Sequence, residues 1–139
     1  MATLIKPEVS KKNMYWIDKH RHYELRHFCL QYPIWKKTIN NVYNSLSATS
    51  KFERMPTSNL PGDPVGDLVT MKVLYETKIE LIEATALKTD KALSNYILKG
   101  VTEGLSYVQL KSRLNIPCGR DMYYDRYRRF FWLLSQAKD

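Results

Sequence analysis

The residues best suited to chemistry lie near the C-terminus, where cations and a tyrosine recur at helical spacing. Six side chains make up this set: Arg120, Tyr124, Arg126 and Arg128, with Lys111 and Arg113 just upstream. Arginine can pair bidentately with guanine or clamp phosphates, and a tyrosine hydroxyl can hydrogen-bond to a phosphate. The chemistry on offer is therefore recognition of a nucleic-acid polyanion.

Two helices joined by a tight turn would position these side chains. Ser106 is suited to cap the first helix, and Leu110 and Leu114 would pack it on the second. Asn115 can adopt the positive φ that the turn needs, and Ile116 would fill the corner. This pattern predicts a helix-turn-helix over residues 105–139, a motif that places its second helix in the major groove of DNA.

The second helix of this motif is expected to have a packed face and an outward face. The inward stripe is expected to comprise Met122 or Tyr123, followed by Tyr127, Phe130 and Leu134. Arg120, Tyr124 and Arg128 then fall toward the outer face. The alternative is a terminal amphipathic helix with solvated arginines. The aromatic run 130–134 leaves open whether this helix is buried on more than one side or docks a partner.

The charge of the chain is concentrated at its two ends. The formal net charge is +8 at pH 7, with +5 in residues 1–37, −1 in 38–104 and +4 in 105–139. Such a balance favours an anionic partner. We expect four cations of the N-terminal part to add phosphate contacts: Lys11, Lys12, Lys19 and Arg21. If most of these cations engage, the affinity for DNA should fall with salt at a log–log slope of roughly −4 to −7.

Apolar periodicity predicts an all-α fold, a helical bundle ending in the helix-turn-helix. The expected divisions are a flexible basic arm (1–13), an N-terminal helical hairpin (14–46), a linker loop (47–62) and a helical domain (63–139). Helices are expected at about 15–31, 34–46, 64–88 and 91–101, with a break at Pro33. The long stripe from Leu68 to Ala86 fits the spine of a bundle or the seam of a homodimer, and we favour the bundle.

Other classes of function find little support. The chain has no glycine-rich phosphate loop, nucleophile elbow or metalloprotease motif, so we expect neither an enzyme nor a cofactor. His20, His22, His27 and Cys29 lack zinc-ligand spacing, and the histidines are interpreted as partly exposed helix residues, whereas Cys29 is expected on the apolar face of the same helix. No run approaches a membrane span, no secretory signal opens the chain, and two distant cysteines suit reduced thiols. We expect a protein of the bacterial host cytoplasm.

Two stretches carry a family resemblance. Residues 15–21 (YWIDKHR), and 115–121 (NIPCGRD) through 130–134 (FFWLL), resemble small proteins encoded in phages and prophages of Firmicutes. The C-terminal part is similar to the end of RinA-type phage transcriptional activators, whose tail resembles the promoter-reading region 4 of sigma factors. The resemblance implies that residues 117–128 read DNA, with Asp121 and Asp125 as departures from the pattern.

The leading hypothesis is a phage-derived transcriptional regulator that binds double-stranded DNA, with host RNA polymerase as a further candidate partner. A second hypothesis is a protein-interaction module whose terminal helix docks on polymerase, a sigma factor or a host defence protein. A third is a small DNA-packaging subunit that binds DNA as a ring.

Overall fold

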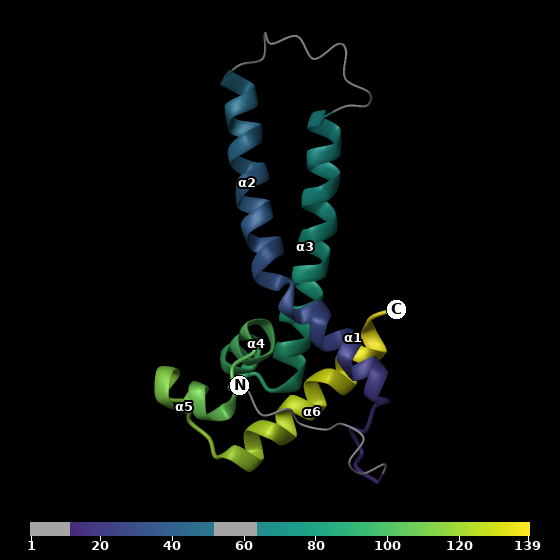
Figure 1. The fold of residues 1–139 in the computed structure, drawn as a ribbon, viewed down its shortest axis with the longest axis vertical. Coiled ribbons are helices and arrows are strands. Elements are labelled where there is room, and N and C mark those ends of the chain that lie inside the picture. Colours follow the sequence, from purple (N-terminus) through teal and green to yellow (C-terminus); the bar gives the residue numbers. More distant parts are fainter. Residues whose placement is uncertain (1–11, 52–63) are drawn as a thin grey trace.

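The computed structural model describes residues 12–51 and 64–139, and this part of the chain is all-helical (Figure 1). The elements are α1 (Lys19–Leu30), α2 (Tyr32–Lys51), α3 (Pro64–Thr89), α4 (Ser94–Glu103), α5 (Tyr107–Leu114) and α6 (Arg120–Ala137). The predicted all-α helical bundle is confirmed.

The body of the molecule is a bundle in which α1, α4, α6 and the C-terminal half of α3 surround one core. Its most buried members come from each of these helices: Leu25, Ile82, Ile97, Phe130 and Leu134, all fully shielded from solvent. The core therefore joins the first and the last helix of the described chain.

An antiparallel hairpin of α2 and α3 projects from this body as a long arm (Figure 1). Trp35 fixes its base, because the indole packs edge-on against Phe28 at 4.9 Å and stacks on Tyr75 at 6.2 Å between ring centroids. The Tyr32 hydroxyl donates to Glu83 Oε2 at 2.5 Å and adds a polar link between the two helices. We call α2 together with residues 64–78 of α3 the arm.

The helix pairing differs from the expected hairpin over residues 14–46. α1 begins at Lys19, where Asp18 caps it by accepting from the His20 amide, and it ends before Pro33, which lies in the first turn of α2. α2 then runs along α3 rather than folding back on α1. Residues 47–51 of the predicted linker continue α2, and its residues 52–62 lie outside the described residues. Residues 1–11 of the predicted basic N-terminal segment also lie outside them.

The histidines of α1 also differ from the expectation. His20 and His27 are exposed, but His22 is only 3% exposed, with its ring edge-on to Phe131 at 4.8 Å. Cys29 is buried too, and burial raises the pKa of its thiol. Two of the four residues are therefore part of the core between α1 and α6.

Candidate nucleic-acid interface

The α5–α6 corner, residues 106–120, is built as the sequence predicts. Ser106 accepts from the Gln109 amide, and the Gln109 side chain accepts in return from the Ser106 amide, which makes a full capping box. Asn115 ends α5 in the left-handed conformation at φ 52°, and Ile116 is fully buried beneath the turn. The turn and its cap are therefore specified locally.

Tyrosine hydroxyls tie the two helices of the corner together. The Tyr107 hydroxyl donates to the Cys118 carbonyl at 2.7 Å, and the Tyr124 hydroxyl accepts from the Tyr107 amide at 3.3 Å. Leu114 was expected to pack α5 on α6, but its side chain is 39% exposed. Val108, also on α5, is 62% exposed. The tyrosines and Ile116 thus hold the corner in place of Leu114.

Three exposed cations lie on the α5–α6 corner, two in the last turn of α5 and one at the first residue of α6. Lys111, Arg113 and Arg120 are exposed, and none of them forms an ion pair within the part of the chain that the structure describes. Lys111 donates to the Ile116 carbonyl at 3.3 Å, and the Arg120 guanidinium lies 5.6 Å above the Tyr124 ring. Gly119 precedes α6 without a side-chain cap, so the first amides of this helix remain open to an acceptor.

Tyr124 does not lie on the outer face. Its side chain is only 7% exposed, because α6 is buried on two adjacent stripes, one through Tyr123 and Phe130 and the other through Tyr124 and Phe131. Tyr124 therefore contacts the Arg120 guanidinium through its ring, and we no longer count it among the residues that would contact DNA. The aromatic run 130–134 left open whether α6 is buried on more than one side or docks a partner, and the burial of both stripes shows that α6 is covered on more than one side.

Arg126 and Arg21 have protein partners. Arg126 Nε donates to Asp90 Oδ2 at 2.8 Å, and the guanidinium also bonds the adjacent Asp125; together these interactions raise the pKa of Arg126 and lower that of Asp90. Arg21 holds the end of α6 through the Ser135 and Lys138 carbonyls, at 2.9 and 2.6 Å. We therefore count neither arginine among the free cations of the interface.

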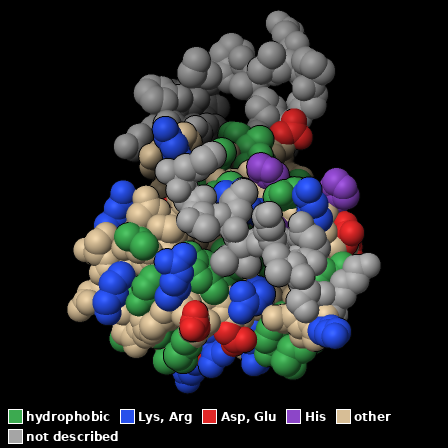
Figure 2. Space-filling view, turned by 60° about the horizontal axis from the view of Figure 1, so that its bottom comes forward, with side chains coloured by type: hydrophobic (Ala, Val, Ile, Leu, Met, Phe, Trp, Pro, Cys, Tyr) green, Lys and Arg blue, Asp and Glu red, His purple; other side chains and the backbone are tan. Residues whose placement is uncertain are grey.

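The remaining expected contacts are scattered. Arg128 is partly covered, and its buried Nε makes no hydrogen bond to the described residues. Arg129, which is not among the contacts predicted from the sequence, is half-buried. Lys12 and Lys19 are exposed, but α1 begins beside the end of α6, about 22 Å along that helix from Arg120. Lys11 lies outside the described residues. Figure 2 views the molecule from the end that carries α5 and α6, and it shows cations spread over this surface with acidic side chains among them.

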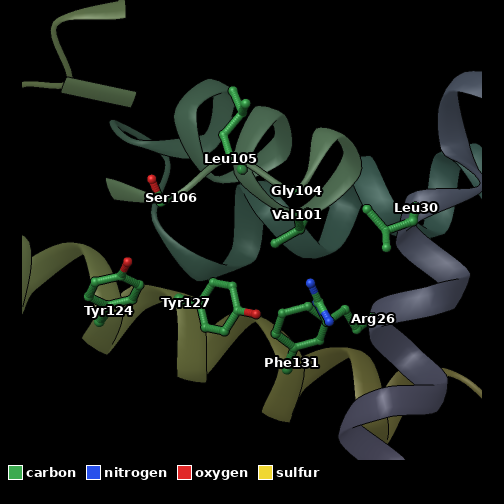
Figure 3. Close-up of a pocket in the computed structure, with 10 residues that line it drawn as sticks. Arg26, Leu30, Val101, Gly104, Leu105, Ser106, Tyr124, Tyr127 and Phe131 are labelled. Carbon is green, nitrogen blue, oxygen red and sulfur yellow. The ribbon is translucent and has the colours of Figure 1, made fainter. Parts of the chain in front are cut away.

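A small hollow lies behind the corner, between α1, α4 and α6 (Figure 3). Arg26, Tyr127 and Phe131 line it together with the Gly104–Ser106 link, and it offers about 20 Å³, room for about one water molecule. Burial raises the pKa of the Tyr127 hydroxyl, and the nearby Arg26 charge opposes that shift. The hollow is far too small for a metabolite.

The described part of the chain meets neither the requirements of a metal site nor those of a membrane-spanning helix. Within residues 12–51 and 64–139, no three His, Cys, Asp or Glu side chains gather at a metal-binding distance. None of the helices described there has the length and apolar character needed to cross a bilayer.

Fold and site together define a class: a small all-helical protein with a projecting hairpin and a basic two-helix corner. Comparison of the chain with protein-family models, with curated proteins and with solved structures gave no match. Any function must therefore be argued from the corner itself.

Proposed function

We propose that this protein binds double-stranded DNA through the α5–α6 corner, used as a helix-turn-helix, and regulates transcription in a phage or its host. One observation supports the DNA contact above others: Lys111, Arg113 and Arg120 are exposed on the corner and have no carboxylate partner among the described residues, next to the N-terminus of an 18-residue helix that lacks a side-chain cap. The regulatory role rests on the resemblance to RinA-type activators.

The N-terminus of α6 would enter the major groove, as the second helix of such motifs does. Arg120 extends from its first turn and could reach a guanine edge or a phosphate, and Lys111 and Arg113 would contact flanking phosphates. Asp121 is exposed on the same turn and would repel phosphates, so we expect phosphate contacts to supply most of the affinity and base contacts to supply little.

Salt dependence tests the number of cations that act. With Arg21 and Arg126 occupied by protein partners, three free cations at the corner predict a log–log slope of about −3, shallower than expected from sequence alone. Fluorescence anisotropy of a labelled duplex over a range of salt concentrations measures it.

A pair of charge reversals tests the site. Arg120→Glu should weaken binding at low salt at least about tenfold and make the slope shallower by about 1. Lys37→Glu makes the same charge change at an exposed position on α2 and should alter the affinity less than about twofold, because screening limits effects from distant charges. No binding at low salt, or an equal loss in both variants, would refute the proposal. Sequencing the fragments that the protein retains then measures its base preference.

A further inference from the structure

Helix α3 has two apolar faces, and the inner one is packed from Tyr75 to Ala86, whereas Met71 near its start is 37% exposed. The inner face packs on α2 and the core through Tyr75, Ile79, Ile82 and Ala86. The outer face of α3, as we name it, comprises Val69, Thr70, Val73, Leu74 and Thr77. All five are exposed and uncharged, Val73 and Leu74 by 55% and 56%, and the exposed Glu80, two turns after Val73, borders this face. Helices that are apolar on more than one side are normally buried on each of them.

The outer face continues into a groove beside α6. At 3.6 residues per turn, Thr70, Thr77, Leu81, Ala84 and Lys88 fall on one stripe of α3. The lower part of this stripe forms one wall of a groove of about 260 Å³, whose other wall is Leu133, Gln136 and Ala137 of α6. A single stripe is thus half covered by α6 in the body and uncovered in the arm.

We infer that a second copy of this chain covers the outer face, with its α3 antiparallel to the first and the two-fold axis near Thr77. In this register Val73 lies opposite Leu81 of the second copy, and Thr70 lies opposite its Ala84. The exposed apolar side chains of each arm therefore enter the groove of the other copy. A two-fold interface needs such a self-complementary surface, with the same patch used twice.

The charges at the ends of the stripe support both the occupant and its direction. Asp67 and Lys88 are exposed at opposite ends of the outer face, and neither makes an ion pair in residues 12–51 and 64–139. Antiparallel packing brings Asp67 of each copy next to Lys88 of the other. Parallel packing would instead place like charges together, which is unfavourable.

The contact is large enough to be stable. From residue 67 to residue 88 the seam measures about 32 Å along α3. Stable interfaces bury about 800 Å² on each partner, so the seam needs the flanking α6 side chains of the groove on both copies as well as α3. The inference does not depend on DNA binding, because the outer face lies away from the α5–α6 corner (Figure 1).

Sedimentation velocity of the full chain tests this pairing. We expect a dimer of the 16.4 kDa chain at tens of micromolar, and a loss of affinity of at least about a hundredfold in Val73→Glu, since two charges would then be buried at one seam. Val108→Glu is the matched control, because this valine is 62% exposed on α5, and it should remain dimeric. Circular dichroism verifies that both variants fold. A monomeric wild type, a larger oligomer, or equal behaviour of the two variants would overturn the inference.

Mixing two charge variants tests the antiparallel direction. Asp67→Lys and Lys88→Glu should each weaken self-association about tenfold, because each change places two pairs of like charges at the seam. An equimolar mixture should regain association, since every contact in the mixed dimer joins opposite charges. Single variants that associate as tightly as the wild type would refute the antiparallel register, because parallel packing joins like charges in the wild type and in both variants. A mixture that associates no better than either variant alone would refute it too.

Discussion

Replacing Gly100 by alanine should destabilise the protein, although glycine is a poor helix former. Gly100 lies within α4, and a Cβ built there would be 2.2 Å from the Tyr123 hydroxyl oxygen and 3.3 Å from the ring carbon that bears it. Tyr123 is 1% exposed, so its ring has little room to move. Overpacking of this kind costs about 1–3 kcal/mol, whereas the better helix propensity of alanine returns about 1 kcal/mol.

Because a contact of 2.2 Å forces neighbouring atoms to shift, the cost should lie in the upper part of this range, about 2–3 kcal/mol. The net loss in unfolding free energy should then be about 1–2 kcal/mol, which corresponds to a Tm lower by about 3–8 °C for a chain of this size. Tyr123→Phe separates the clash from other effects, because it removes the hydroxyl alone. That hydroxyl is buried without a hydrogen bond to the described residues, so its removal should stabilise the protein by about 1 kcal/mol.

In the Tyr123→Phe background, Gly100→Ala should become neutral or stabilising by up to about 1 kcal/mol, because the contact at 2.2 Å is gone and only the ring carbon at 3.3 Å opposes the helix propensity gain. A double-mutant cycle by urea denaturation measures this difference as a coupling of about 1–3 kcal/mol. An equal effect of Gly100→Ala in both backgrounds would refute the close approach of α4 to α6.

Two further predictions concern the body and the corner. Arg126 lowers the pKa of Asp90, so the pair stabilises the fold above the unfolded pKa of about 3.9, and this contribution is lost as the pH falls through the folded value. Asp90→Asn keeps the oxygen that caps the turn before α4 and should lower the unfolding free energy by about 1–2 kcal/mol at pH 7. Urea denaturation should show this difference between the two proteins shrinking progressively as the pH falls below about 4. At the left-handed Asn115, Asn115→Ala should lower the unfolding free energy by about 1 kcal/mol, whereas Asn115→Gly should leave it equal or higher; identical effects would contradict the turn geometry.

Local signals in the sequence were sufficient for the corner. The Ser106 cap, the left-handed Asn115 and the buried Ile116 all depend on neighbours within a few residues, and each was predicted and is confirmed. The break at Pro33 and the start of α3 at Pro64 belong to the same category, because proline acts through its own ring and the adjacent backbone.

Long-range packing decided what the sequence could not. Tyr123 and Tyr124 each begin a stripe with helical spacing, and only the position of α1 and α4 on both sides of α6 shows that both are buried. Arg126 is paired with Asp90, 36 residues away, and no local rule selects that partner over solvent or DNA. In the same way, the choice of α3 rather than α1 as the companion of α2 depends on Trp35 reaching both Phe28 and Tyr75.

The hydrogen bonds from Arg21 to the end of α6 join α1 directly to α6. The arm is therefore an insertion in a body whose first and last helices already contact each other. α1 and α6 contact each other and α4 directly, so the chain leaves the body at the start of α2 and returns to it through α3. Adding seven residues to both arm helices would lengthen the arm by about 10 Å and preserve which side chains face each other. The length of the arm can therefore change without altering the geometry of the α5–α6 corner.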